Sequence, residues 1–207
     1  VLIGDQLWMK KNLSTIYYNN CDLIPTGHNN FTWSNLSTDA YAVYPASHDE
    51  FSQTTCENDC SVIYGNLYNW YAVNDSRGIC PIGWHIPSDD DFKELEMHLG
   101  MSNSEVDNTG YRGTNQGSKL AGYAGIWNNG DLDNNSEFGL SNFDSLPAGN
   151  RYINGNYQGM GSYSYLWSST SGNINHAFAR LLDYNSSKIY RGFSPKHIGF
   201  SVRCLKD

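Results

Sequence analysis

The sequence predicts an α+β domain with few helices, short strands and long irregular loops. Short apolar runs are separated throughout by Gly and Asn, which are residues that end regular structure. Helical periodicity is clear over residues 88–100, and strand-like alternation is clear over residues 200–204. The chain has 207 residues, of which 14% are aromatic, so it is too rich in aromatic residues to be disordered. We interpret it as a single domain, 1–207.

The N-terminal part begins with a short strand-like run, in which Trp8 and Met9 are expected to face the core. The following residues, 26–62, are turn-rich and polar, with Trp33 as a strong apolar point. We interpret 26–62 as a loop-rich insertion. Residues 64–73, YGNLYNWYAV, place aromatic side chains at helical spacing and predict a short helix with an aromatic core face.

Residues 79–100 carry the clearest local pattern, that of a helix with both ends marked. Ser88 is a good N-cap, Asp91 lies where a capping box needs an acceptor, and Gly100 ends the helix. The stripe that faces the core is Phe92, Leu95 and Leu99. Three aspartates occupy positions 89–91, where the helix dipole favours negative charge, so they need no bound cation to explain them.

Residues 101–164 are rich in Gly and Asn and irregular. Asp131, Asp133 and Glu137 alternate like the first half of a calcium loop, but Ser136 stands where the EF-hand needs Gly. The EF-hand match therefore fails. A looser calcium site built from oxygen ligands stays open, although Asp and Asn are also common in ordinary turns.

The C-terminal run 165–204 has the composition of a binding surface laid over a small β-scaffold. Ala177–Asp183 and Lys188–Arg191 are strand candidates joined by turn residues at 185–187, which predicts a hairpin. Phe200, Val202 and Cys204 alternate with polar residues, which predicts a half-buried strand, and Trp167 is expected to anchor the core.

Between these framework residues lie side chains that follow no buried period. Tyr, Ser, Gly and Asn are favoured in antibody-like binding surfaces, because tyrosine gives contact area at low entropy cost and the others give adaptable hydrogen bonds. The outer face of a sheet with ordinary turns has a similar composition, so both interpretations stand. The predicted ligand-binding residues are Asn173, Asn175, His176, Phe178, Tyr184, Asn185, Lys188, Tyr190, Phe193, Ser194 and His197.

Charge and cysteine usage limit the function classes. The formal net charge is −8 with no basic cluster, which argues against a nucleic-acid partner. No apolar run has the length of a membrane span, and no signal peptide precedes Val1, so we expect the native start to be missing. The sequence contains no nucleophile–base motif of known spacing, so we do not predict an enzyme. We predict no cofactor either.

Five cysteines favour an oxidising location, extracellular or at the cell surface. Cys56 and Cys60 lie in a polar setting without further Cys or His ligands nearby, so a local disulfide is a better interpretation than a metal site. Cys80 and Cys204 would then form a long-range pair, and Cys21 is left over as a buried or free thiol.

Several segments resemble the Fibrobacter succinogenes major paralogous domain, a bacterial extracellular family. The similar segments run in the expected order over nearly the whole chain: GDQLWMKKNL at 4–13, YGNLYNWYAV at 64–73, CPIGWHIPSDDDFKEL at 80–95, SLPAGNR at 145–151, LWSST at 166–170 and GFSVRCLKD at 199–207. Residues 26–62 depart from the family's plainer N-terminal region, and Cys21 stands where the family pattern has glycine.

The resemblance implies a C-type-lectin-like fold, in the variant shared with formylglycine-generating enzymes. In that fold a small mixed sheet is flanked by two helices, here expected at Tyr64–Val73 and Ser88–Leu99, and by long irregular loops. The last strand, ending at Cys204, is expected to lie beside the N-terminal part.

Some relatives are variable proteins of diversity-generating retroelements, which mutate adenines and so convert Asn codons to many others. The matching segment here is 171–198, between the framework segments LWSST and GFSVRC. Its mixture of Asn, Tyr, His and Phe is what such mutagenesis leaves, and an ordinary family member can carry it too.

Three function classes follow. The first is an extracellular recognition or adhesion protein, on a bacterial cell or a phage, that binds an unidentified protein or glycan. The second is a carbohydrate-binding cell-surface module without diversification, because Tyr and Trp rings stack on sugars. The third, which is less favoured, is an enzyme of glycan metabolism, which needs two facing carboxylates.

Overall fold

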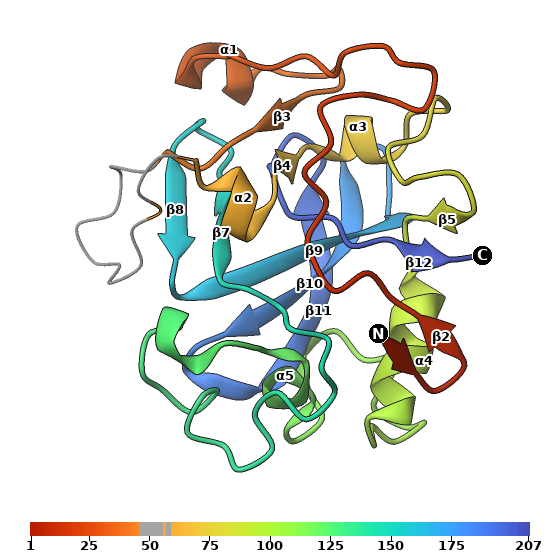
Figure 1. Ribbon diagram of the computed structural model, residues 1–207, viewed down its shortest axis with the longest axis vertical. Helices are drawn as coiled ribbons and strands as arrows, with labels where there is room; N and C mark the ends of the chain where they lie inside the picture. The colour runs from red at the N-terminus through yellow and green to blue at the C-terminus, as the bar shows by residue number, and fades with distance from the viewer. Residues whose placement is uncertain (46–55, 57–58) are drawn as a thin grey trace.

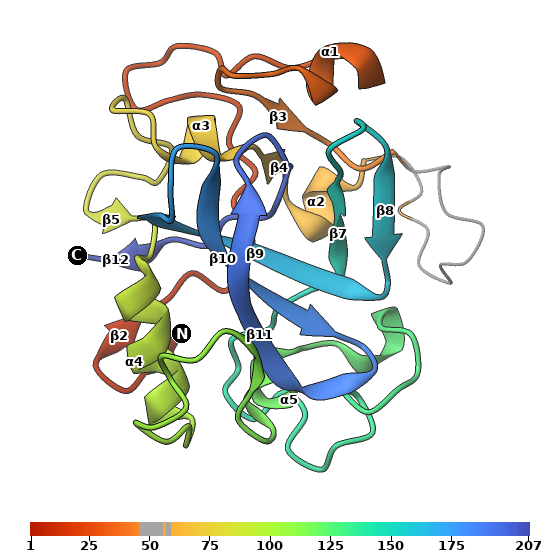
Figure 2. The ribbon, with the colours of Figure 1, turned by 180° about the vertical axis from the view of Figure 1, so that it is seen from behind.

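A mixed sheet forms the centre of the protein. The computed structural model describes residues 1–45, 56 and 59–207. Within that range the main sheet has the strand order β6-β11-β10-β9-β7-β8, with β7 parallel to β9 and the other neighbours antiparallel (Figures 1 and 2). The expected α+β class with a mixed sheet is confirmed. The strands are β6 Gly110–Arg112, β7 Ala148–Arg151, β8 Tyr157–Met160, β9 Tyr163–Ser171, β10 His176–Asp183 and β11 Ser186–Pro195.

The remaining elements are short, with one exception. Residues 89–98 form α4, Asp89–His98, the longest helix in the described part of the chain. The other helices are α1 Asn30–Ser34, α2 Ser61–Tyr64, α3 Trp70–Val73, α5 Gln116–Leu120 and the 3₁₀ turn η1 Ala124–Ile126. Paired two-residue strands complete the fold: β1 Leu2–Ile3 with β2 Gln6–Leu7, β3 Tyr41–Ala42 with β4 Leu67–Tyr68, and β5 Trp84–His85 with β12 Leu205–Lys206.

Helix α4 confirms its sequence prediction. The Ser88 side chain accepts a hydrogen bond from the Asp91 backbone, and the Asp91 carboxylate accepts one from the Ser88 backbone, which completes the capping box. Gly100 follows with φ +98°, a conformation that favours glycine. The predicted stripe of Phe92, Leu95 and Leu99 is buried. The dipole explanation of the three aspartates is incomplete, however, because Asp89 is buried against two arginines.

The helix predicted over Tyr64–Val73 is wrong. Gly65, at φ +76°, ends α2, the chain then forms β4, and only residues 70–73 return to a helix. The asparagines explain the break, since Asn66 donates to the Ser14 carbonyl and Asn69 caps α3 by accepting from the Ala72 amide. Tyr64, Tyr68 and Trp70 are buried as expected, but from a strand and two short helices rather than from one helical face, and Tyr71 is only half-buried.

The half-buried strand predicted at 200–204 is also wrong. Ser201 and Arg203, expected to face water, are fully buried, and the segment makes isolated bridges instead of a regular strand. Arg203 fits in the core because it donates to Asn12 Oδ1 at 2.7 Å and to the Phe143 and Asp144 carbonyls.

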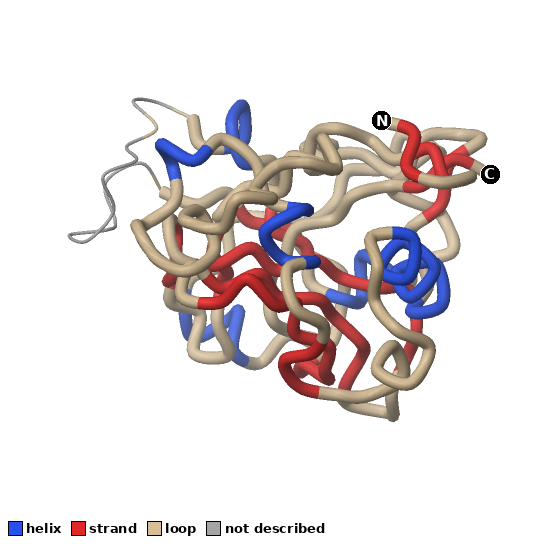
Figure 3. The backbone as a smooth tube through the Cα atoms, turned by 90° about the horizontal axis from the view of Figure 1, so that it is seen from below, coloured by secondary structure: helices blue, strands red, loops and turns tan. Residues whose placement is uncertain are grey.

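The C-terminal segment lies beside the N-terminal part, as the resemblance implied. The Met9 and Leu13 amides donate to the carbonyls of Cys204 and Val202. Trp8 forms a bridge with Leu205, so the two termini lie close together (Figure 3).

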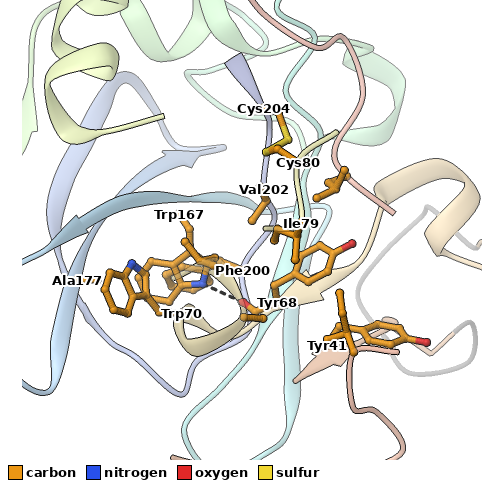
Figure 4. Close-up of a cluster of buried hydrophobic side chains, with 14 of the residues drawn as sticks. Tyr41, Tyr68, Trp70, Ile79, Cys80, Trp167, Ala177, Phe200, Val202 and Cys204 are labelled. Carbon is orange, nitrogen blue, oxygen red and sulfur yellow. Dashed lines mark hydrogen bonds between the residues drawn. A yellow bond between two sulfur atoms is a disulfide. The ribbon is translucent and has the colours of Figure 1, made fainter. Parts of the chain in front are cut away.

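Both predicted disulfides are present. Cys80 and Cys204, separated by 124 positions, are joined with a Cα–Cα distance of 5.9 Å, and Cys56 is joined to Cys60. Next to the long-range bridge, Trp167 is completely buried and donates from Nε1 to the Tyr68 carbonyl at 2.8 Å (Figure 4). Trp167 therefore anchors the core as predicted.

The described part of 26–62 is not structureless. Residues 30–34 form α1, residues 41–42 form β3, and Trp33, Ala40 and Ala42 make a small buried cluster. Residues 46–55 and 57–58 of the predicted insertion lie outside the described residues.

Candidate binding surfaces

The β10–β11 hairpin carries the predicted ligand-binding residues. Its turn is Tyr184–Asn185, one position earlier than predicted, because Asp183 pairs with Ser186 across the strands. β11 is also longer than expected, since it runs on to Pro195. None of the predicted contact residues is buried; each is exposed or half-buried.

The hairpin separates these residues into two groups, which corrects the expectation of one continuous surface. Phe178 and Tyr184 are six positions apart on an extended chain, a distance of about 20 Å. One group lies where β10 begins and β11 ends, and we name it the loop-end patch: Asn173, Asn175, His176, Phe178, Phe193, Ser194 and His197. The other group lies near the turn: Tyr184, Asn185, Lys188 and Tyr190.

Two phenylalanines form the centre of the loop-end patch. Phe178 and Phe193 are paired across the strands, with ring centroids 4.2 Å apart and planes inclined by 37°. Phe193 is 49% exposed and its ring lies over Gly172, where a Cβ would be 2.3 Å from the ring. The guanidinium of Arg191 lies 4.3 Å from the Phe178 ring centroid, so a cation–π contact stabilises the position of this ring.

Amides and imidazoles surround this aromatic pair. Asn173 Oδ1 accepts from the Asn175 and His176 amides and lies 3.1 Å from His176 Nδ1, which holds the loop in a tight turn. Burial, together with the nearby His176, lowers the pKa of His197. Ile174, which sequence reasoning missed, is 84% exposed beside these groups. The patch therefore offers apolar contact area with directional polar groups around it.

Beneath the patch, Lys196 is buried, an unusual position for lysine. Its Nζ donates to Ser171 Oγ at 2.9 Å and lies 4.2 Å from the Trp70 ring centroid. The Lys196 carbonyl also accepts from the Trp70 amide. These contacts join the end of β11 to α3 and to the end of β9.

A buried charge network fixes the hairpin on α4. Asp89 pairs with Arg180 of β10 at 2.7 Å and with Arg191 of β11 at 2.6 Å. Glu96 pairs with Arg180 and with Arg112 of β6, each at 2.6 Å. Burial alone would raise the pKa of Asp89, but hydrogen bonds from Arg191 and the charge of Arg180 hold it well below its usual range. The scaffold of the patch is thus positioned by charges spread over α4 and three strands.

Tyr190 lies on the opposite face of the sheet from Phe178 and Phe193. Its neighbours there include Tyr111, Tyr163 and Tyr165, none of which sequence reasoning selected. The alternation of Tyr163 and Tyr165 was a signal for a shared face. Tyr111 gave no such signal, because its strand has three residues and lies far away in the sequence.

Two of the three residues considered for calcium are used in other contacts, and the third, Asp131, is exposed. Asp133 Oδ1 accepts from the Gly130 amide, and Glu137 pairs with Lys119 at 3.0 Å. Over residues 1–45, 56 and 59–207, no group of three or more His, Cys, Asp or Glu is placed to hold a metal ion. No helix in the same range has the length and apolarity needed to cross a membrane.

Comparison with known proteins gives one match. The model of the Fibrobacter succinogenes major domain matches residues 1–206. No curated protein and no solved structure matches the chain.

Proposed function

The chain belongs to the Fibrobacter succinogenes major domain family, and we propose that it is an extracellular recognition protein that binds its ligand through the loop-end patch. The observation that carries the proposal is the Phe178–Phe193 pair. Two adjacent rings, each partly open to solvent, lie among Asn and His side chains on a scaffold held by buried ion pairs. Pre-organised aromatic anchors with a polar rim are typical of binding sites.

The location outside the cell is supported by the disulfides. The Cys80–Cys204 and Cys56–Cys60 bonds are stable in oxidising compartments and rare in the cytoplasm.

For the fold we propose the C-type-lectin-like arrangement, in the variant shared with formylglycine-generating enzymes. In its favour are the mixed sheet, the long loops and the return of the C-terminal segment to the N-terminal part. Against a simple match is the first of the two flanking helices, since residues 64–73 hold only the last residue of α2 and the four-residue helix α3.

Binding rather than catalysis is supported by the composition of the patch. None of its side chains is a carboxylate, whereas glycoside hydrolysis requires a pair of them. An interface for a protein or a glycan needs only the apolar area and hydrogen-bonding groups that the patch supplies.

We also propose that segment 171–198 is the diversified part of the protein. The hairpin buries residues on both of its faces, Ala177 and Ala179 on one and Leu182 and Ile189 on the other. The predicted contact residues are instead its outward positions, exposed or half-buried near the two ends of the hairpin or in loops. Changes at the outward positions would leave the core intact. The test is genomic: a near-copy of codons 165–204 that differs mainly at adenines should lie beside a reverse-transcriptase gene. An adjacent genome without such a copy would contradict diversification while leaving the binding proposal in place.

The binding test uses the purified protein on a glycan array and against a displayed peptide library. We expect ligands that bind the wild type and are lost in Phe193→Ser and in Gly172→Ala, which displaces the Phe193 ring without removing it. The matched control is Phe31→Ser, which removes an 80% exposed phenylalanine from α1. Glycan hits would identify a carbohydrate-binding module and peptide hits a protein receptor. Ligands that bind all three variants equally would place the site elsewhere.

A further inference from the structure

A second surface lies on the other face of the sheet, near the hairpin turn. Tyr111, Tyr190, Leu181 and Tyr165 are paired in register across β6, β11, β10 and β9, so their side chains share this face. In the next register position, Tyr163 lies opposite Asp183. We name the tyrosine face as the set Tyr111, Tyr163, Tyr165, Tyr190 and Asp183.

Glycines let two of these rings lie flat on the sheet. A Cβ at Gly192 would be 2.5 Å from the Tyr190 ring, and a Cβ at Gly159 would be 2.7 Å from the Tyr163 ring. Each ring therefore covers a glycine on its inner side. Tyr111 is 45% exposed, and Tyr163 and Tyr190 are half-buried, so these three rings are accessible to a partner. Tyr165 is also half-buried, but one face of its ring is stacked on Phe200 with centroids 4.6 Å apart.

The rings are inclined to one another instead of forming one plane. Tyr111 and Tyr190 have centroids 5.3 Å apart at an interplanar angle of 71°, and Tyr163 and Tyr165 are 5.9 Å apart at 46°. A sugar ring that stacks on one of these faces cannot stack on its neighbour. A cationic group has no such restriction, because it can contact the negative faces of two inclined rings at once.

A carboxylate without an ion-pair partner lies among these rings. Asp183 accepts hydrogen bonds from the Tyr111 hydroxyl at 2.6 Å and from the Asn185 amide at 3.0 Å. Among the described residues none forms an ion pair with Asp183; Lys188, on the same strand face as Tyr190, is exposed and does not neutralise it. Burial and the bond to Asp183 raise the pKa of Tyr111, so that hydroxyl stays a donor at neutral pH.

We infer that the tyrosine face binds an arginine or lysine side chain of a polypeptide partner. The tyrosine rings supply cation–π contacts, and Asp183 supplies the complementary charge on a chain whose net charge is −8. The tyrosine face and the Phe178–Phe193 pair lie on opposite faces of the hairpin, so this inference is independent of whether the loop-end patch binds a ligand.

The test titrates the protein with the capped peptide Gly-Gly-Arg-Gly-Gly and follows the tyrosine ring resonances by NMR. The lysine peptide is the second probe, the citrulline peptide is a neutral analogue of nearly the same shape, and maltohexaose represents a glycan. We expect Arg and Lys peptides to shift the resonances of Tyr111, Tyr163, Tyr165 and Tyr190 at millimolar concentration, and citrulline to have no effect. The shifts should weaken as salt is added.

Two variants make the result specific. Asp183→Asn should weaken Arg-peptide binding about three- to fivefold, and Gly192→Ala should do the same by displacing the Tyr190 ring. Gly172→Ala, which disturbs Phe193 on the other face, should leave this binding unchanged. Circular dichroism establishes that each variant is folded. Equal shifts with citrulline, shifts with maltohexaose alone, or no shifts with any peptide would overturn the inference.

Discussion

Oδ1 of Asp89 lies 2.7 Å from Nη1 of Arg180, and both side chains are buried. The pair joins the first turn of α4 to the middle of β10, across 91 positions of sequence. Arg191 of β11 binds the same carboxylate, so one aspartate holds both strands of the hairpin. The orientation of the candidate binding surfaces therefore depends on a charge far from either of them in sequence.

Replacing Asp89 with Asn should destabilise the protein by about 3–5 kcal/mol, because buried Arg191 would lose its carboxylate partner and buried Arg180 would keep only Glu96. The matched control is Asp90→Asn in the same helical turn. The Asp90 side chain is 89% exposed, so its loss should change the free energy of unfolding by no more than about 0.5 kcal/mol. Urea denaturation at pH 7 measures both. If both variants unfold at the same urea midpoint, the buried ion pairs of Asp89 add nothing to the free energy of unfolding beyond the helix-dipole effect that both aspartates share.

Several of the features that the sequence predicted correctly have local signals. Ser88, Asp91 and Gly100 mark the ends of α4 within a few residues, and the spacing of Cys56 and Cys60 indicates their bond. The role of Asp89 has no local signal, because its partners lie 91 and 102 positions further along. From the sequence alone, the helix dipole is a sufficient explanation for an aspartate in the first turn of a helix. Only the structure shows that arginines lie beside Asp89.

The incorrect predictions have a common physical cause, which is polar side chains that bind the backbone or each other inside the core. Alternation predicted an outward face for Arg203, but Asn12 and two carbonyls satisfy its guanidinium inside the protein. Helical spacing predicted a continuous helix through Asn66 and Asn69, yet both side chains bind main-chain groups and favour turns. The two-surface division of the hairpin could not be seen either, because it requires knowing which face each strand residue occupies.

Removing the long-range disulfide should cost far more than removing the local one. On the chain-entropy model, Cys80→Ala with Cys204→Ala should lower the free energy of unfolding by about 4–5 kcal/mol. Cys56→Ala with Cys60→Ala, which opens a loop between residues four positions apart, should lower it by about 2 kcal/mol. Thermal and urea unfolding of the two double variants measure the difference. Equal costs would mean that strain or packing, not loop closure, sets the contribution of these bonds.

Acidification should destabilise the protein partly through His197. Burial and the neighbouring His176 lower its pKa below the ordinary 6.5, so the folded state takes up this proton less readily than the unfolded chain. Stability from this group is therefore fully present above about pH 7 and is lost as the pH falls from 6.5 towards the lower folded pKa. His197→Gln should lose less stability than the wild type between pH 7 and pH 5, as measured by urea midpoints. Parallel losses in the two proteins would show that His197 does not contribute.

Cys21 occupies a backbone position suited to glycine. Its φ is +70°, in the left-handed region, within a tight turn where the Cys21 amide donates to the Tyr18 carbonyl and the Tyr18 amide donates to the Asp22 carbonyl. A side chain in this conformation destabilises the folded state by about 1–2 kcal/mol. Glycine removes that strain, but it also raises the conformational entropy of the unfolded chain, which offsets part of the gain. Cys21→Gly should thus raise the free energy of unfolding by about 0.5–1 kcal/mol. Cys21→Ala, which removes the exposed thiol but keeps the Cβ, should leave stability unchanged; if alanine stabilises as much as glycine, the thiol and not the backbone is the source of the strain.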